Sequence, residues 1–192
     1  MRILLAALIG GIVMFIWGVI AHMALGLGNP GLHAPAHEDA VLSTLHEGLG
    51  AEPGVYMLPW LGPDQMGDEA AVQAYRQKAA TSPYAWIVYL PQARDGTQMG
   101  AQIAVQWVSD TLAALTLTLI IALAPLSFRQ RLGVALAAAV FAWLSTMVPY
   151  WNWYHFPLSL TLAALVEQVI GWLLAGAAIA WWLGRREQAA VR

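Results

Sequence analysis

Long apolar runs separated by short polar breaks dominate the hydropathy pattern of this chain. The first run extends over residues 3–27 without a charged side chain, which is roughly 37 Å of helix at 1.5 Å per residue. Such a helix crosses a hydrocarbon core of about 30 Å with some tilt. The run exceeds the apolar stretch of about 7 to 15 residues found in a cleaved signal peptide, so we interpret it as a first transmembrane helix.

Three further apolar runs follow in the second half of the chain. They cover residues 103–126, 132–148 and 157–183. The third run is short because Pro149 is expected to end it, and the fourth is expected to end at Gly184 and the two arginines that follow. The pattern therefore predicts four transmembrane helices.

The segment between the first two runs has a different pattern. Residues 38–49 place apolar side chains on one helical face, and residues 68–80 have an acidic first turn and basic later residues, as a helix does. Residues 55–58 and 84–90 are short, β-rich apolar runs that predict strands. Because a segment of about 70 residues has a small core, we expect it to lie as a lid against the bundle mouth.

The predicted fold class is therefore membrane all-α, with four transmembrane helices. A small outward-facing α+β lid is inserted between helices one and two. In domain terms, residues 1–27 form helix one, residues 28–100 form the extracytoplasmic lid, and residues 101–192 form helices two to four with a short cytoplasmic tail.

Composition narrows the possible classes of protein. Apolar residues make up 59% of the chain and charged residues only 10%, which excludes a soluble enzyme. The net charge of −2 comes with no basic patch that would indicate a nucleic-acid partner. The chain has no cysteine, so disulfides, iron–sulfur clusters and thiolate zinc sites are excluded as well.

Arginine placement predicts the orientation in the membrane. If the chain crosses four times, six arginines fall on one side, and the positive-inside rule puts both termini in the cytoplasm of a bacterial-type inner membrane. These are Arg2, Arg129, Arg131, Arg185, Arg186 and Arg192. Aromatic residues crowd the opposite side at 150–156, including Trp153 and Tyr154, and are expected to anchor the chain at the outer interface.

Three strongly ionisable residues fall inside the predicted helices: His22, Asp110 and Glu167. Counted from the outward helix ends, they lie roughly 7, 10 and 14 Å deep. Each lies on a face of small or polar residues. His22 shares the face of Ala7, Gly11 and Gly18, small residues that allow helices to pack closely, and Gln106 shares the face of Asp110. We therefore expect one buried polar site under the lid. The candidate ligand-binding residues are His22, Gln106, Asp110, Glu167, Trp153 and Tyr154.

Three interpretations of this site remain open. The three ionisable residues join the helices by hydrogen bonds, form a site for a proton, a metal or a polar ligand, or lie at a water-exposed position near the lid. A haem between His22 and His155 is a weaker alternative, and so is a metal site among His33, His37 and His46, whose spacing fits no single helical face. No metal site is assigned and the cofactor stays unknown.

No hydrolase, nucleotide-binding or zinc-protease motif occurs in the sequence, and whether the chain is an enzyme stays open. The leading interpretation is a binding or accessory subunit of a membrane assembly. Its partners would be the lipid bilayer and either another membrane protein or further copies of the chain, with no nucleic acid. The alternatives are an intramembrane catalyst or proton- or cation-coupled permease, and a haem or quinone electron carrier.

Overall fold

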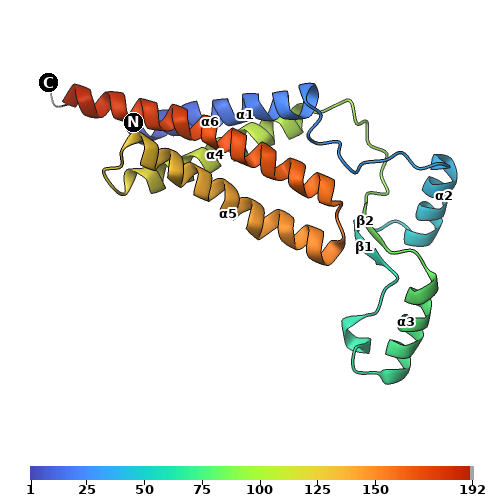
Figure 1. Cartoon of the computed structure of the whole chain (residues 1–192). Helices are drawn as coiled ribbons and strands as arrows, with labels where there is room; N and C mark the ends of the chain where they lie inside the picture. The colour runs from blue at the N-terminus through green and yellow to red at the C-terminus, as the bar shows by residue number, and fades with distance from the viewer. Residues whose placement is uncertain (191–192) are drawn as a thin grey trace. The chain divides into compact units, whose positions relative to one another are not determined.

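The chain forms a mostly helical structure. The computed structural model describes residues 1–190, and about 70% of it is helical (Figure 1). Among these residues, four helices are long and apolar enough to cross a membrane, as the hydropathy pattern predicts: Arg2–Ala24, Gly100–Ala122, Phe128–Tyr154 and Leu158–Arg185. The chain therefore has the character of a multi-pass membrane protein. The C-terminal Arg192 lies outside the described residues, and the side chain of Arg186 is also not described.

The first span contains a change of helix type. The α-helix α1 (Arg2–Val19) continues into a π-helical turn, η1 (Ile20–Ala24), in which the Leu25 N–H bonds to the Ile20 carbonyl at 3.0 Å. A π turn carries one more residue than an α turn and so rotates the side chains that follow it. His22 lies in the middle of this turn.

The four spans pack in the order α4 (Gly100–Ala122), α1, α6 (Leu158–Ala190) and α5 (Phe128–Tyr154). α1 lies between α4 and α6, and α5 lies along α6 (Figure 1). The core of the bundle is small and apolar, with the fully or almost fully buried residues Ala6, Ala114, Leu117, Ile121, Ala135, Ile179 and Leu183.

Glycines allow these helices to approach closely. A Cβ at Gly11 would lie 2.6 Å from the Cα of Thr111 on α4, and a Cβ at Gly10 would lie 2.7 Å from Ile179 on α6. Between α6 and α5, a Cβ at Gly176 would lie 2.5 Å from the Cβ of Ala135. The small-residue face predicted on helix one is therefore the contact face of α1, as is usual for helices packed inside a membrane.

The third span is longer than the sequence pattern predicted. The expectation that residues 132–148 form a short helix ending at Pro149 is wrong, because α5 has 27 residues and contains Pro149. At its start, Ser127 accepts a bond from the Gln130 N–H while the Gln130 side chain accepts from the Ser127 N–H, which is a capping box. At its end, His155 adopts a left-handed conformation with φ of 56°.

Two other helix ends also differ from expectation. The apolar run of helix two was expected to extend to residue 126, but α4, which begins at Gly100, ends at Ala122, before the turn that contains Pro125. Helix four was predicted to end at Leu183, but α6 continues through Gly184 and Arg185. A single glycine costs a helix only about 1 kcal/mol, so it does not end a long helix by itself.

Residues 33–96 form a second compact unit. It contains α2 (Glu38–Leu49), β1 (Gly54–Leu58), a 3₁₀ turn η2 (Pro63–Gln65), α3 (Glu69–Thr81) and β2 (Ala85–Tyr89). The two helices and two strands predicted here are confirmed, with ends that differ by about one residue. Asp68 caps α3 by accepting bonds from the Ala70 and Ala71 N–H groups.

The two strands form an antiparallel pair in which Gly54 faces Tyr89 and Leu58 faces Ala85. On one face of this ribbon the rings of Tyr56 and Tyr89 meet edge to face, with centroids 6.1 Å apart. Of the residues in this unit, only Pro59 and Gly62 are buried, and neither has a large side chain. The expectation of a small core is therefore confirmed.

Candidate functional site

A groove opens between α1 and α4, and we call it the α1/α4 groove. It has a volume of about 570 Å³, and the side chain of Glu167 reaches it from α6. The lining residues are Met14, Phe15, Gly18, Val19, His22, Met23, Met99, Gln102, Ile103, Gln106, Asp110 and Glu167. Most of the lining is therefore apolar, and its ionisable groups are one imidazole and two carboxyls.

The first polar pair in the groove joins α1 to α6. His22 Nε2 lies 3.0 Å from Glu167 Oε1, which is hydrogen-bond distance. The His22 side chain is 55% exposed and that of Glu167 is 18% exposed. Gly28 packs directly on the His22 ring, because a Cβ at that position would overlap Nδ1. The π turn and this glycine together fix the direction of the imidazole.

The backbone around Glu167 is held by the same two helices. The indole N–H of Trp17 donates to the Glu167 carbonyl oxygen at 3.0 Å. Next to it, a Cβ at Gly171 would lie 2.6 Å from Trp17 Cδ1, so α6 can approach α1 here only because residue 171 is glycine. The position of the carboxyl is therefore fixed by packing as well as by its contact with His22.

The second polar pair lies within α4. Gln106 Nε2 donates to Asp110 Oδ1 at 2.9 Å across one helical turn. The Asp110 residue is only 7% exposed. A buried carboxyl with a neutral donor beside it retains hydrogen-bonding capacity toward the groove, because each carboxylate oxygen accepts more than one hydrogen bond.

Four of the six candidate residues from the sequence line the groove: His22, Gln106, Asp110 and Glu167. The other two do not. Trp153 and Tyr154 lie in the last turn of α5, where Trp153 is 72% exposed and the Tyr154 ring packs 5.6 Å from that of Tyr150. His155, the proposed second haem ligand, follows them and does not line the groove either.

The spacing of small residues in helix one predicts the wrong role for Gly18. It was grouped with Gly11 as a helix-packing residue, but a Cβ at Gly18 would meet nothing within 4 Å. Gly18 instead keeps the groove open. The spacing of small residues on one helical face could not separate these two roles, because both positions share that face.

Within the residues that the structure describes, no group of three or more His, Asp or Glu side chains is placed to hold a metal ion. The three histidines of the 33–47 stretch are exposed, and His46 Nδ1 lies 3.5 Å from the Tyr89 hydroxyl. The groove offers hydrogen-bonding groups in mainly apolar surroundings.

Comparisons of the chain with protein-family models, with curated proteins and with solved structures find no match.

Proposed function

We propose that this chain is a membrane-embedded binding protein that acts as an accessory subunit of a membrane assembly. Its α1/α4 groove holds a lipophilic small molecule by a hydrogen-bonding polar group. The observation that carries this proposal is the convergence of His22, Glu167, Gln106 and Asp110 on one apolar groove. Residues that only joined helices would not need to line an open cavity.

The lining limits the chemistry of the ligand. A volume of about 570 Å³ is in the usual range for small-molecule sites. The lining contains two carboxyls and no Lys or Arg among its residues, so it suits a neutral or cationic polar group and disfavours an anionic one. Met14, Phe15 and Ile103 would contact the apolar part of the ligand, and a quinone falls within this class.

The membrane orientation is part of the proposal. With four spans, the arginines at the start of α1, at the start of α5 and in the C-terminal part of the chain share one side, which the positive-inside rule assigns to the cytoplasm. Both termini would then be cytoplasmic in an inner membrane, and residues 33–96 would be outside. A reporter fused after Arg192 should be active only in the cytoplasm and one inserted at Gly62 only outside. A cytoplasmic signal at Gly62 would contradict this topology.

The His22–Glu167 pair favours a second candidate function. An imidazole at 3.0 Å from a carboxyl can pass a proton, which is the element that a proton-coupled permease or an intramembrane catalyst needs. Proteoliposomes with an internal pH dye distinguish this function from binding alone. Proton entry that is lost in Glu167→Gln would support the permease.

The binding proposal is tested by filling the groove. Gly18→Leu should occupy it without backbone strain, because the space beside Gly18 is open. Gly133→Leu is the matched control, since Gly133 on α5 also has open space and does not line the groove. Each protein is extracted in its native lipids, and the co-purifying small molecules and polypeptides are identified by mass spectrometry.

We expect a lipophilic compound that accompanies the native chain and Gly133→Leu but is missing from Gly18→Leu. A compound that is retained by all three proteins would show that the groove is not its site. A Soret band in the extract would instead identify the ligand as haem. If the native chain carries no compound beyond bulk lipid, the binding proposal is wrong.

A further inference from the structure

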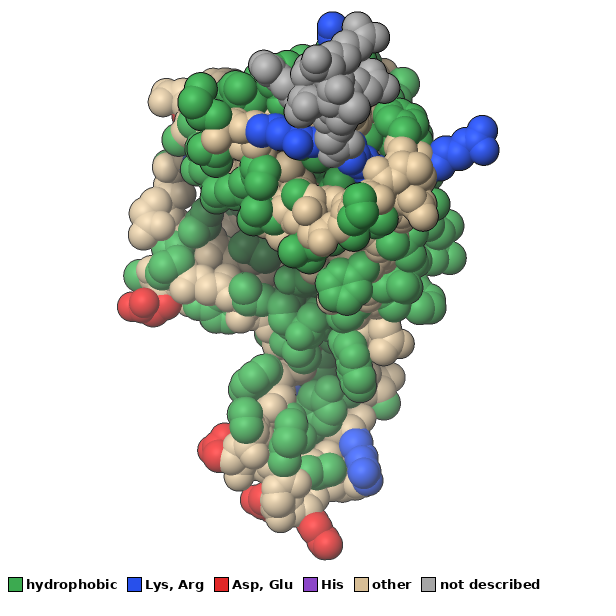
Figure 2. Space-filling view, turned by 90° about the vertical axis from the view of Figure 1, so that its left-hand side faces the viewer, with side chains coloured by type: hydrophobic (Ala, Val, Ile, Leu, Met, Phe, Trp, Pro, Cys, Tyr) green, Lys and Arg blue, Asp and Glu red, His purple; other side chains and the backbone are tan. Residues whose placement is uncertain are grey.

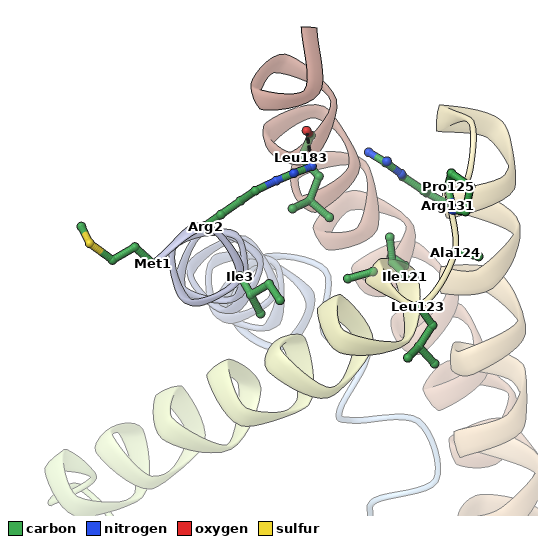
Figure 3. A pocket seen from close by; sticks show the side chains of 10 residues that line it. Met1, Arg2, Ile3, Ile121, Leu123, Ala124, Pro125, Arg131 and Leu183 are labelled. Atoms are coloured by element: carbon green, nitrogen blue, oxygen red, sulfur yellow. Dashed lines mark hydrogen bonds between the residues drawn. The ribbon is translucent and has the colours of Figure 1, made fainter. Parts of the chain in front are cut away.

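A second cavity lies at the end of the bundle where α1 begins and α4 ends, and we call it the arginine pocket (Figure 3). Its volume is about 580 Å³. All four spans contribute to it, through Arg2 and Ile3 on α1, Ile121 and the following Leu123 on α4, Arg131 on α5 and Leu183 on α6. It is therefore separate from the α1/α4 groove, with which it shares no lining residue.

Two arginines are held in this pocket by the backbone of α6. Arg2 Nη2 donates to the Leu183 carbonyl at 2.9 Å, and Arg131 Nη1 donates to the Ala180 carbonyl at 3.2 Å. The two side chains approach α6 from opposite sides (Figure 3). A peptide carbonyl carries no net charge, so these two bonds fix the positions of the guanidinium groups without adding a negative charge to the pocket. Arg131 is only 4% exposed.

The end of the bundle that holds this pocket has an excess of positive charge. The described residues at this end, 1–3, 123–131 and 184–185, contain four arginines and no acidic residue. Figure 2 looks onto this end of the bundle and shows arginine side chains gathered over its upper part.

The remaining wall of the pocket is apolar and lies at the end of the spans. Ile3, Ile121 and Leu183 form its inner side, and Leu123 at its rim is highly exposed. The apolar part of α4 ends at Ala122 and that of α1 begins at Ile3, so the pocket lies at the level where lipid head groups meet the hydrocarbon core. A soluble anion would leave this apolar wall uncovered, whereas a lipid would cover it with an acyl chain.

We propose that the arginine pocket binds the phosphate of an anionic phospholipid, with an acyl chain along the apolar wall. Guanidinium groups bind phosphate through paired hydrogen bonds, and two of them converge here from different helices. Basic pockets between transmembrane helices are known binding sites for anionic head groups. The lipid would join the start of α1 to α5 and α6, which all contribute residues to the pocket.

The experiment uses the full chain in a neutral detergent and native mass spectrometry. Phosphatidylglycerol and phosphatidylcholine with identical acyl chains are titrated, and the ratio of their apparent affinities is measured. We expect the native chain to prefer phosphatidylglycerol. Arg2→Gln and Arg131→Gln should each lower this preference roughly fivefold, the effect of one basic residue near an anionic surface.

The control is Arg129→Gln, which makes the same charge change on the same helix at an exposed residue outside the pocket. It should keep the preference within twofold of the native chain. An equal loss in Arg129→Gln would mean that general surface charge, and not the pocket, attracts the lipid, and the proposal would be overturned.

Two further measurements test the identity of the ligand and the role of each arginine. If inorganic phosphate or glycerol 3-phosphate at millimolar concentration displaces the lipid completely, the pocket is a site for a soluble phosphate and the lipid proposal fails. If Arg131→Gln does not fold, Arg2→Gln and Arg131→Lys are compared, because lysine keeps the charge but loses the paired geometry. A native chain without preference for phosphatidylglycerol also overturns the proposal.

Discussion

The helical bundle and the 33–96 unit form regular structure equally well but bury side chains very differently. In the part of the chain that the structure describes, every fully buried aliphatic side chain belongs to the bundle. The 33–96 unit adds no large apolar side chain to this buried set, and many of its own are exposed, as they are on the outside of the bundle: Val41, Leu42, Val55, Leu58, Trp60, Met66, Val88 and Leu90. The difference teaches that local signals suffice to form helices and strands, whereas a core requires elements that can approach closely.

The two regions owe their structure to different residues. In the 33–96 unit, the Asp68 cap and the strand register are local features, and each is visible within a few residues of sequence. In the bundle, Gly10 and Gly11 bring α1 against helices that lie about a hundred residues or more further along the chain. Stability should therefore depend on long-range packing in the bundle and on local structure in the 33–96 unit.

The largest expected effect comes from separating the two regions. Residues 28–100 expressed alone should aggregate or stay partly unfolded, because their buried core is too small to offset the entropy of folding. Circular dichroism during heating should show no cooperative transition. A sharp transition would show that the unit is an independent domain and would remove the contrast with the bundle.

A change at one glycine should destabilise the bundle strongly. Gly11→Val puts a Cβ within 2.6 Å of the Thr111 Cα, so α1 and α4 must move apart. We expect a loss of about 3 kcal/mol in the unfolding free energy, the upper range for overpacking. Gly18→Val is the matched control in the same helix, with open space at its Cβ, and should cost less than about 1 kcal/mol. Denaturant titration in mixed micelles measures both variants.

The polar pairs of the two regions should also differ in how strongly their two side chains are coupled. His22→Gln and Glu167→Gln should be non-additive by about 1 kcal/mol, because the two side chains are in contact and Glu167 is mostly shielded. The corresponding double-mutant cycle in the 33–96 unit combines His46→Gln with Tyr89→Phe. In the native chain, the His46 Nδ1 and the Tyr89 hydroxyl are 3.5 Å apart and exposed. There we expect additivity within about 0.3 kcal/mol. Amide hydrogen exchange measures the change in stability of each region separately.

Additivity in both cycles would mean that His22 and Glu167 do not interact in the folded chain. The groove would then lose its best-defined polar pair. Non-additivity in both cycles would instead show that the 33–96 unit is more ordered than its burial indicates.

The smallest effect is expected on the surface of the strand pair. Val88→Thr should change stability by less than about 0.5 kcal/mol, because Val88 is 73% exposed. Ile179→Val, which removes one methyl group from a fully buried residue of α6, should cost about 1 kcal/mol. A large effect of Val88→Thr would reveal that the exposed face of the strands is covered in the assembled protein.

Sequence patterns predicted the number and the approximate positions of the spans because hydropathy depends on composition within one segment. They failed at Pro149. The helix was expected to end there, but it continues to Tyr154. The residue pair Ser127 and Gln130 carries a capping signal that places the start of α5 at residue 128, and that signal was available in the sequence.

The candidate site was predictable only in part. Depth and helical face correctly brought His22, Gln106, Asp110 and Glu167 together. The sequence could not show that α1 lies between α4 and α6, because each apolar helix has more than one face that could pack. The π turn at Ile20–Ala24 also leaves no recognised pattern in the sequence, although it contains His22.

The central position of α1 has a consequence for synthesis of the chain. A ribosome adds about 5 to 20 residues per second. The first span therefore leaves the ribosome several seconds before its partner α4 is complete, and longer still before α6 is complete. During that interval the glycine face of α1 has neither of its neighbours, and only lipid or a helix of an insertion factor is available to cover it. Assembly of this protein is thus expected to depend on the order in which its spans emerge. The first helix has the longest interval between its own synthesis and the synthesis of its packing partners.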